Sequence, residues 1–160
     1  MAQFGRYFEE FNVGDVYKHW PGRTITESDD MLFCMLTMNH HPLHIDANYA
    51  KDSDYGRQVV VGNLVVDIAF GQSVPDVSGR ALANLGFEKI EFLAPTFHGD
   101  TIYSESEVLE KKESSSRPDR GIVSVETRAR NQDGKVVMSF RRSVMIAKRP
   151  AGEAEAETPK

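Results

Sequence analysis

The sequence predicts an α+β fold in which an antiparallel sheet lies against one long, buried helix. Residues 63–73 are apolar on nearly all sides, which is typical of a helix covered by other elements. From residue 83 onward the chain consists of four segments with strand character, and two of them alternate apolar and polar side chains. Asp133-Gly134, between the last two segments, is a strong hairpin signal. Helices followed by a run of strands predict an α+β arrangement.

The first 25 residues predict an irregular arm followed by an interrupted strand. Residues 5–14 contain many aromatic and acidic side chains, and we expect them to pack as an arm. Residues 15–25 have strand character, but Pro21-Gly22 breaks the strand because these residues disrupt strand pairing.

Thr26 marks the predicted start of a first helix. It opens a run of hydroxyl and acidic residues. Hydroxyl side chains cap the start of a helix, and acidic side chains are stabilised by the positive end of the helix dipole there. The apolar residues 31–36 continue this helix, and it should end before Pro42. A short second helix is predicted over residues 47–51, directly after Asp46.

The long helix is predicted at residues 63–73. Gly62 precedes it, and Pro75 and Gly79 are expected to close it. This helix is apolar on several sides, and each of them needs cover. The sheet can cover only one side. A second copy of the protein could cover another.

The strands are predicted at residues 83–92, 101–111, 122–130 and 136–147, arranged as a meander. The third strand has a clear two-faced pattern. One face carries Val123, Val125, Thr127 and Ala129, and the other carries Ile122, Ser124, Glu126 and Arg128. We expect one domain over residues 1–148 and a disordered tail over residues 149–160, where large apolar residues are missing.

Composition excludes several classes of protein. The chain has 160 residues and a formal net charge of −5, which argues against nucleic acid as a partner. No apolar run approaches the roughly 20 residues that span a bilayer, so no membrane partner is expected. No basic region precedes an apolar core near the start, so no signal peptide is expected and the prediction is a cytoplasmic protein. The single cysteine, Cys34, excludes an internal disulfide and is interpreted as a buried, inert thiol.

The segment Asn39-His40-His41-Pro42-Leu43-His44-Ile45-Asp46 contains three of the five histidines of the chain. Histidine changes its protonation near neutral pH, and proline restricts the backbone beside it. A rigid loop that holds imidazoles beside an apolar segment indicates proton transfer.

This segment, extended to residues 36–50, resembles the hydratase motif of the MaoC-like dehydratases, the (R)-specific enoyl-CoA hydratase group. Val61-Gly62-Asn63-Leu64 resembles the His-Gly-Met-Leu of that family at the start of the central helix. Phe92, Ala94-Pro95 and Gly99-Asp100 resemble its Phe-x-x-Pro-Val-x-x-Gly-Asp pattern. The likeness covers roughly residues 10 to 147. It implies the hot-dog fold, a sheet wrapped around a long central helix, and a homodimer.

The resemblance implies an acyl-CoA hydratase or dehydratase. In the family, a motif Asp and His activate water that adds across a thioester-conjugated double bond, and a glycine N–H holds the thioester oxygen. His44 matches the motif His, and Gly62 matches the glycine. No cofactor is expected, since coenzyme A is part of the substrate and no nucleotide-binding motif is present.

Asn39 occupies the position of the motif Asp, which is the main departure from the family pattern. A carboxamide cannot accept a proton at pH 7, so Asn39 can orient water but cannot deprotonate it. His44, oriented by His41, is one candidate for the base, and Asp67 on the central helix is another. Asp67 would be costly among apolar neighbours unless it is paired, and such groups gather at functional sites.

Each of these residues also has a structural interpretation. His44 could be a core histidine bonded to the backbone, and His41 could either line the site or make a structural bond. Asp67 could form a salt bridge with an arginine of a partner subunit. Asp46 is interpreted as a helix cap, and His40 as solvent-facing.

A metal ion bound by His40, His41, His44 and Asp46 is the alternative to proton transfer in this segment. Consecutive histidines point in different directions, and no second ligand group appears, so no metal is predicted.

Three functional hypotheses remain. The first is a hydratase in which Asn39 and His44 are catalytic and His41, Gly62 and Asp67 bind substrate, for example a branched or dicarboxylic thioester of the mesaconyl or methylmalyl type. The second is a hot-dog thioesterase that uses Asp67. The third, motivated by Asn39, is a non-catalytic subunit of a heteromeric hydratase.

Overall fold

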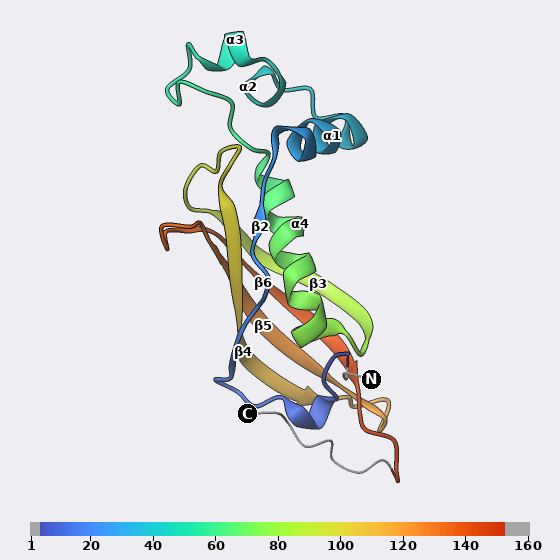
Figure 1. The fold of residues 1–160 in the computed structure, drawn as a ribbon. Helices are drawn as coiled ribbons and strands as arrows, with labels where there is room; N and C mark the ends of the chain where they lie inside the picture. The colour runs from blue at the N-terminus through green and yellow to red at the C-terminus, as the bar shows by residue number, and fades with distance from the viewer. Residues whose placement is uncertain (1–3, 153–160) are drawn as a thin grey trace.

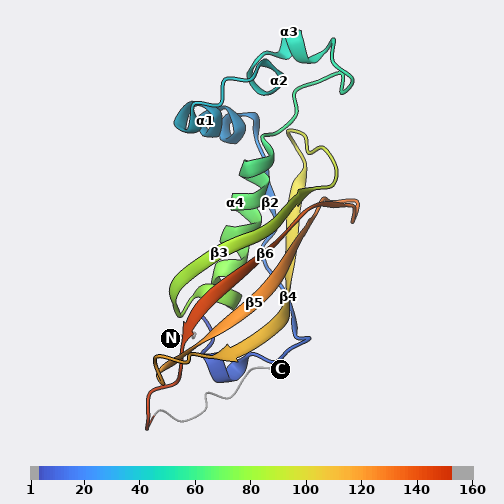
Figure 2. The ribbon, with the colours of Figure 1, turned by 180° about the vertical axis from the view of Figure 1, so that it is seen from behind.

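The computed structural model describes residues 4–152, so residues 153–160 of the predicted tail lie outside the described residues. The elements in chain order are η1 (Phe8–Glu10), β1 (Val16–Lys18), β2 (Arg23–Thr24), α1 (Glu27–Thr37), α2 (Pro42–Ile45), α3 (Ala47–Ala50), α4 (Gly62–Ser73), η2 (Val74–Ser78), β3 (Ala81–Phe92), β4 (Thr101–Glu113), β5 (Arg120–Arg130) and β6 (Val136–Ala147). Helix α4 lies along one face of a curved sheet, and α1, α2 and α3 lie beyond one end of that sheet, near the start of α4 (Figures 1 and 2). The predicted α+β arrangement is confirmed.

The order of the strands differs from the predicted meander. The sheet runs β1-β4-β5-β6-β3 with antiparallel pairing, and β2 pairs with β4 off this path. The meander is correct for β4, β5 and β6 but wrong for β3, which pairs with β6. The linker of residues 93–100 is not a tight turn, because the N–H groups of Leu93 and Ala94 still donate to the carbonyl of Val137 on β6. The chain therefore follows β6 before it crosses to β4.

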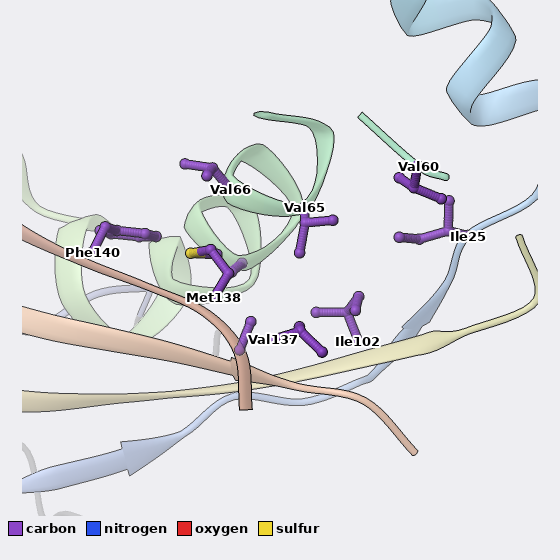
Figure 3. Close-up of a cluster of buried hydrophobic side chains, with 10 residues drawn as sticks. Ile25, Val60, Val65, Val66, Ile102, Val137, Met138 and Phe140 are labelled. Carbon is purple, nitrogen blue, oxygen red and sulfur yellow. The ribbon is translucent and has the colours of Figure 1, made fainter. Parts of the chain in front are cut away.

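The main apolar core lies between α4 and the sheet. It contains Ile25, Val60, Val65, Val66, Ala69, Ile102, Ala129, Val137, Met138 and Phe140, and Figure 3 shows how these side chains gather between the helix and the strands. Val123, Val125, Thr127 and Ala129 of β5 are fully buried, as their alternation predicts. The long helix is thus covered on its sheet side, and its first turn is held at the end of the sheet where α1 lies.

Local signals place the other helices correctly, with one omission. Thr26 caps α1, which ends at Met38 in the left-handed conformation with φ of 59°. Asp46 caps α3, as predicted. Helix α2 was not predicted, although His41 caps it and Pro42 occupies its first position, where proline is favoured.

Helix α4 ends at Ser73, as predicted, but Pro75 does not end the helical path of the chain. The chain continues from α4 into η2, a π-helical turn that reaches Ser78. Pro75 is tolerated because it lies in the first turn of η2, where a missing N–H removes no intrahelical hydrogen bond.

A buried histidine, His19, links η2 to strand β4. The imidazole of His19 is fully buried, and its Nδ1 lies 2.8 Å from Oδ2 of Asp76 in η2. Its Nε2 lies 2.8 Å from Oγ of Ser106 on β4. Burial lowers the pKa of His19, and the opposing effect of Asp76 offsets only part of the shift. His19 is therefore neutral in the folded protein at pH 7.

Stability should fall as the pH drops below the unfolded pKa of histidine, about 6.5. In that range His19 takes up a proton in the unfolded chain but not in the folded one, so protons favour unfolding. We expect His19→Asn, which keeps a donor toward Asp76, to show a weaker pH dependence of the free energy of unfolding between pH 7.5 and pH 5. Urea unfolding at several pH values measures this, and equal slopes for parent and variant would contradict it.

Candidate active site

A cavity of about 510 Å³ lies where the start of α4 meets the segment before it and the linker after β3. Apolar side chains form most of its wall: Val59, Val60, Val61, Val65, Phe92, Leu93, Ala94, Pro95, Val137 and Met138. Its polar side chains are Asn39, His44, Tyr55, Asn63 and Thr96, and Gly62 lies among them. Three of the residues predicted from the motif, Asn39, His44 and Gly62, therefore share one cavity of a single chain.

His44 is held so that one ring nitrogen is available to the cavity. It is the third residue of α2, and its Nδ1 is 2.6 Å from the carbonyl oxygen of Val59. Since a carbonyl only accepts, Nδ1 carries the proton and Nε2 of the neutral ring is an acceptor. Gln58 donates to the carbonyl of His44 at 2.7 Å and fixes the backbone as well. The hydrogen bond to Val59 is the backbone bond expected for a core histidine. The same bond also orients the ring of His44 for use as a base.

Asn39 enters the cavity just after α1 ends. Its N–H donates to the carbonyl of Cys34 at 3.0 Å, which follows from the left-handed turn at Met38. The N–H of His41 lies 3.4 Å from Oδ1 of Asn39. Because Oδ1 faces this backbone donor, Nδ2 is the group of Asn39 that can donate to a water or hydroxyl oxygen.

Gly62 is the first residue of α4. The first N–H groups of a helix have no intrahelical partner, and the helix dipole makes this end partly positive. A Cβ at Gly62 would lie 2.6 Å from Cε1 of Phe92, so the ring of Phe92 occupies the space that any larger residue needs. The glycine allows the wall of the cavity to close against the start of the helix.

His41 does not line the cavity. It is exposed, and its Nδ1 accepts the N–H of Leu43 at 3.2 Å as the cap of α2. Its ring centroid is 5.8 Å from that of His44. The structural bond considered for His41 is present, and its contact with substrate stays a prediction.

Asp67 also lies outside the cavity lining. Its side chain is exposed on α4. Neighbouring atoms still remove part of the water around its carboxyl, and this desolvation raises the pKa of the carboxyl. Its predicted contact with substrate or a partner stays a prediction. His40 is exposed, as expected, and Asp46 accepts the N–H groups of Asn48 and Tyr49 at 2.9 and 3.0 Å, as a cap does.

Within residues 4–152, no group of three or more His, Cys, Asp or Glu side chains is placed to hold a metal ion. Cys34 is buried, and burial raises the pKa of its thiol, which agrees with an inert thiol rather than a nucleophile. None of the helices in the described part of the chain is long and apolar enough to cross a membrane.

Three polar residues of the cavity were not predicted from the sequence: Tyr55, Asn63 and Thr96. Asn63 could have been found, because it directly follows Gly62 in the quoted motif. Tyr55 and Thr96 carry no local signal, since the folding of two separate loops brings them to the cavity.

Comparisons with known proteins agree with this geometry. A family model described as mesaconyl-CoA hydratase matches residues 2–159. The chain is 36% identical over 155 residues to mesaconyl-CoA hydratase of Cereibacter sphaeroides, covering 96% of this chain and 45% of that protein. It is 34% identical over 154 residues to beta-methylmalyl-CoA dehydratase of Chloroflexus aurantiacus, covering 96% and 44%.

The fold has a counterpart among solved structures. A Mycobacterium tuberculosis protein described as having a double hot-dog fold superposes with a TM-score of 0.85 at 24% identity, covering 96% of this chain and 47% of that protein. This likeness shows the fold alone. The chain spans about half the length of the curated relatives it matches, at 45% and 44%.

Proposed function

Because this chain belongs to the mesaconyl-CoA hydratase family of MaoC-like hot-dog proteins, we propose that it adds water to an enoyl-CoA thioester or removes it. The observation that carries the proposal is the pairing of two features in one cavity. Nδ1 of His44 lies 2.6 Å from the carbonyl oxygen of Val59, which selects the tautomer whose Nε2 can accept a proton, and Gly62 opens α4 in the same cavity.

These groups suffice for a balanced hydration step. Nε2 of His44 accepts a proton from a water that Asn39 orients, and the water oxygen bonds to C3 of the enoyl thioester. The electron pair of the double bond moves toward the thioester oxygen, where the N–H of Gly62 stabilises the developing charge. The proton then passes from His44 to C2, which completes the addition. Dehydration is the reverse.

We favour a dicarboxylic thioester such as mesaconyl-CoA as substrate. Two relatives are named for mesaconyl-CoA and for beta-methylmalyl-CoA. No Lys or Arg lines the cavity within the described residues. A second carboxylate would therefore depend on neutral donors such as Asn63 and Tyr55 and on the positive end of α4.

The proposal is tested with mesaconyl-CoA and crotonyl-CoA assayed in parallel for loss of enoyl absorbance and for thiol release. Hydration lowers the absorbance without releasing thiol, and we expect the faster rate with mesaconyl-CoA. Release of free CoA would instead support a thioesterase. That alternative rests on Asp67, which lies outside the cavity lining.

We also propose that a second hot-dog unit, a copy of this chain, covers the edge strand β3. This strand exposes Leu82, Leu85, Phe87, Ile90 and Phe92. The half-length match to the relatives favours such pairing. Light scattering should give twice the 18.0 kDa mass of one chain. A monomer without activity would favour the hypothesis that this chain is a subunit that needs a different partner. The cytoplasmic location stays a prediction.

Asn39 should contribute by orienting water rather than by taking a proton. We expect Asn39→Ala to lower kcat roughly tenfold, since a hydrogen bond to a reacting group is worth about 1 kcal/mol or slightly more. Asn39→Asp supplies a second proton acceptor and should keep kcat at or above the parent value. Steady-state kinetics of both variants check this, and an aspartate variant as slow as the alanine variant would contradict it.

A further inference from the structure

A buried carboxylate lies behind the cavity wall without lining it. Asp30 of α1 is completely buried, and its Oδ2 is 2.9 Å from Nε2 of His98 in the linker after β3. Its Oδ1 accepts the N–H of Val61 at 3.0 Å. Val61 precedes Gly62 at the start of α4 and has no side chain that could cap this helix. Asp30 thus supplies, from another helix, the carboxylate acceptor that the acid of a capping box supplies to the N–H of an N-cap residue.

The segment of residues 59–62 joins the two groups that the proposed reaction needs. The carbonyl of Val59 accepts the Nδ1 proton of His44 at 2.6 Å. The N–H of Val60 donates to the carbonyl of Thr96 at 2.8 Å, and the next N–H, that of Val61, donates to Asp30. A shift of this segment would therefore move the base and the N–H of Gly62 together.

Asp30 is also connected to Asn39 through its own helix. Cys34, one turn further along α1, is buried, and its carbonyl accepts the N–H of Asn39 at 3.0 Å. The carboxylate is therefore linked to the three predicted site residues that line the cavity, Asn39, His44 and Gly62, although it does not line the cavity itself.

We propose that Asp30, held by His98, is a positioning residue that sets the tautomer of His44 and the direction of the Gly62 N–H. The inference rests on the proposed function for its kinetic effect only. A buried carboxylate is costly unless it is paired and hydrogen-bonded, and here its two oxygens are used by His98 and Val61. Retaining a charge at this depth is reasonable if the start of α4 must be held in one place.

The test compares substitutions that keep or remove each bond. His98→Leu removes the donor to Asp30, whereas His98→Gln keeps an N–H at a similar reach. Asp30→Asn keeps an acceptor for Val61 but loses the charge. Asp29→Asn is the matched control, since Asp29 is the neighbouring acid of α1 but bonds Thr26 and Arg23 instead.

Nitrogen-15 NMR of the His44 ring and the Gly62 amide provides a readout that needs no activity. In the neutral ring of the parent, we expect the proton of His44 on Nδ1 rather than on Nε2. His98→Leu and Asp30→Asn should shift both signals, while Asp29→Asn and His98→Gln should leave them close to the parent. Unchanged signals in folded His98→Leu and Asp30→Asn would overturn the inference.

Kinetics add the second arm. With mesaconyl-CoA, kcat of His98→Leu should fall about 10- to 100-fold, because small displacements of reacting groups cost this much. KM should change by less than about threefold, since the bonds at Asp30 lie away from substrate, and His98→Gln should recover most of the loss. If the parent hydrates no thioester, the proposed function fails, yet the NMR result still decides whether Asp30 positions the segment. A fall in kcat that His98→Gln does not recover would also count against it.

Discussion

Replacement of His44 by alanine should lower kcat for hydration by about 10² to 10⁴, the usual contribution of a general acid–base residue. The reason is geometric. Nδ1 lies 2.6 Å from the carbonyl oxygen of Val59, so Nε2 is the ring nitrogen of His44 that can take a proton from water in the cavity. The loss should appear in kcat, and the protein should remain folded because His44 is only partly buried. Loss of enoyl absorbance, with circular dichroism as a check on folding, measures both.

Two further variants separate chemistry from structure. His44→Asn can still donate to the carbonyl of Val59 but cannot accept a proton at pH 7, so it should be as slow as His44→Ala and more stable. His40→Ala removes an exposed imidazole of the same segment and should keep parent kinetics. Undiminished hydration by His44→Ala would rule out the role of His44 as base.

Replacement of Gly62 by alanine should lower kcat by about 10² to 10³, the usual effect of losing one oxyanion donor. The added Cβ would lie 2.6 Å from Cε1 and 2.8 Å from Cδ1 of Phe92. Either the ring must swing into the cavity or the start of α4 must move, and both disturb the position that the thioester oxygen needs. Overpacking should also destabilise the fold by about 1–3 kcal/mol.

Gly71 provides the matched control in the same helix. It is exposed, and a Cβ there would meet nothing within 4 Å. Gly71→Ala should therefore leave kcat unchanged and raise stability by about 0.5–1 kcal/mol, because alanine is the better helix former. Steady-state kinetics and thermal unfolding of both variants give the comparison. Parent kcat in Gly62→Ala would contradict the assignment of its N–H to the thioester oxygen.

Much of the candidate site could be predicted because its signals are local. The segment around Pro42 and the glycine that opens α4 each occupy a few consecutive residues, and both were recognised through the MaoC-like motif. The resemblance to that family is confirmed by the family match. The direction in which each side chain points could not be predicted from these local signals. His41 caps α2 because it directly precedes Pro42, the first residue of that helix, and Asp67 is exposed because of its phase on α4.

The pairing of β3 with β6 and the bond between Asp30 and His98 could not be predicted. Asp30 and His98 are separated by 68 positions, and no local sequence pattern predicts that they form a bond. Such contacts arise only when separate elements pack. The linker after β3 has to follow β6 before His98 can reach α1, and no turn residue in it signals that route.

The amino-acid sequence by itself determined the four long strands of this protein, its buried central helix and its histidine motif, because each depends on residues close together in the chain. The tertiary structure alone decided the strand order, the protonated nitrogen of His44 and the anchoring of Gly62 through Val61 and Asp30. The physical reason is that a base and an anion site need groups placed to within a fraction of a bond length, and this accuracy comes from contacts between distant segments.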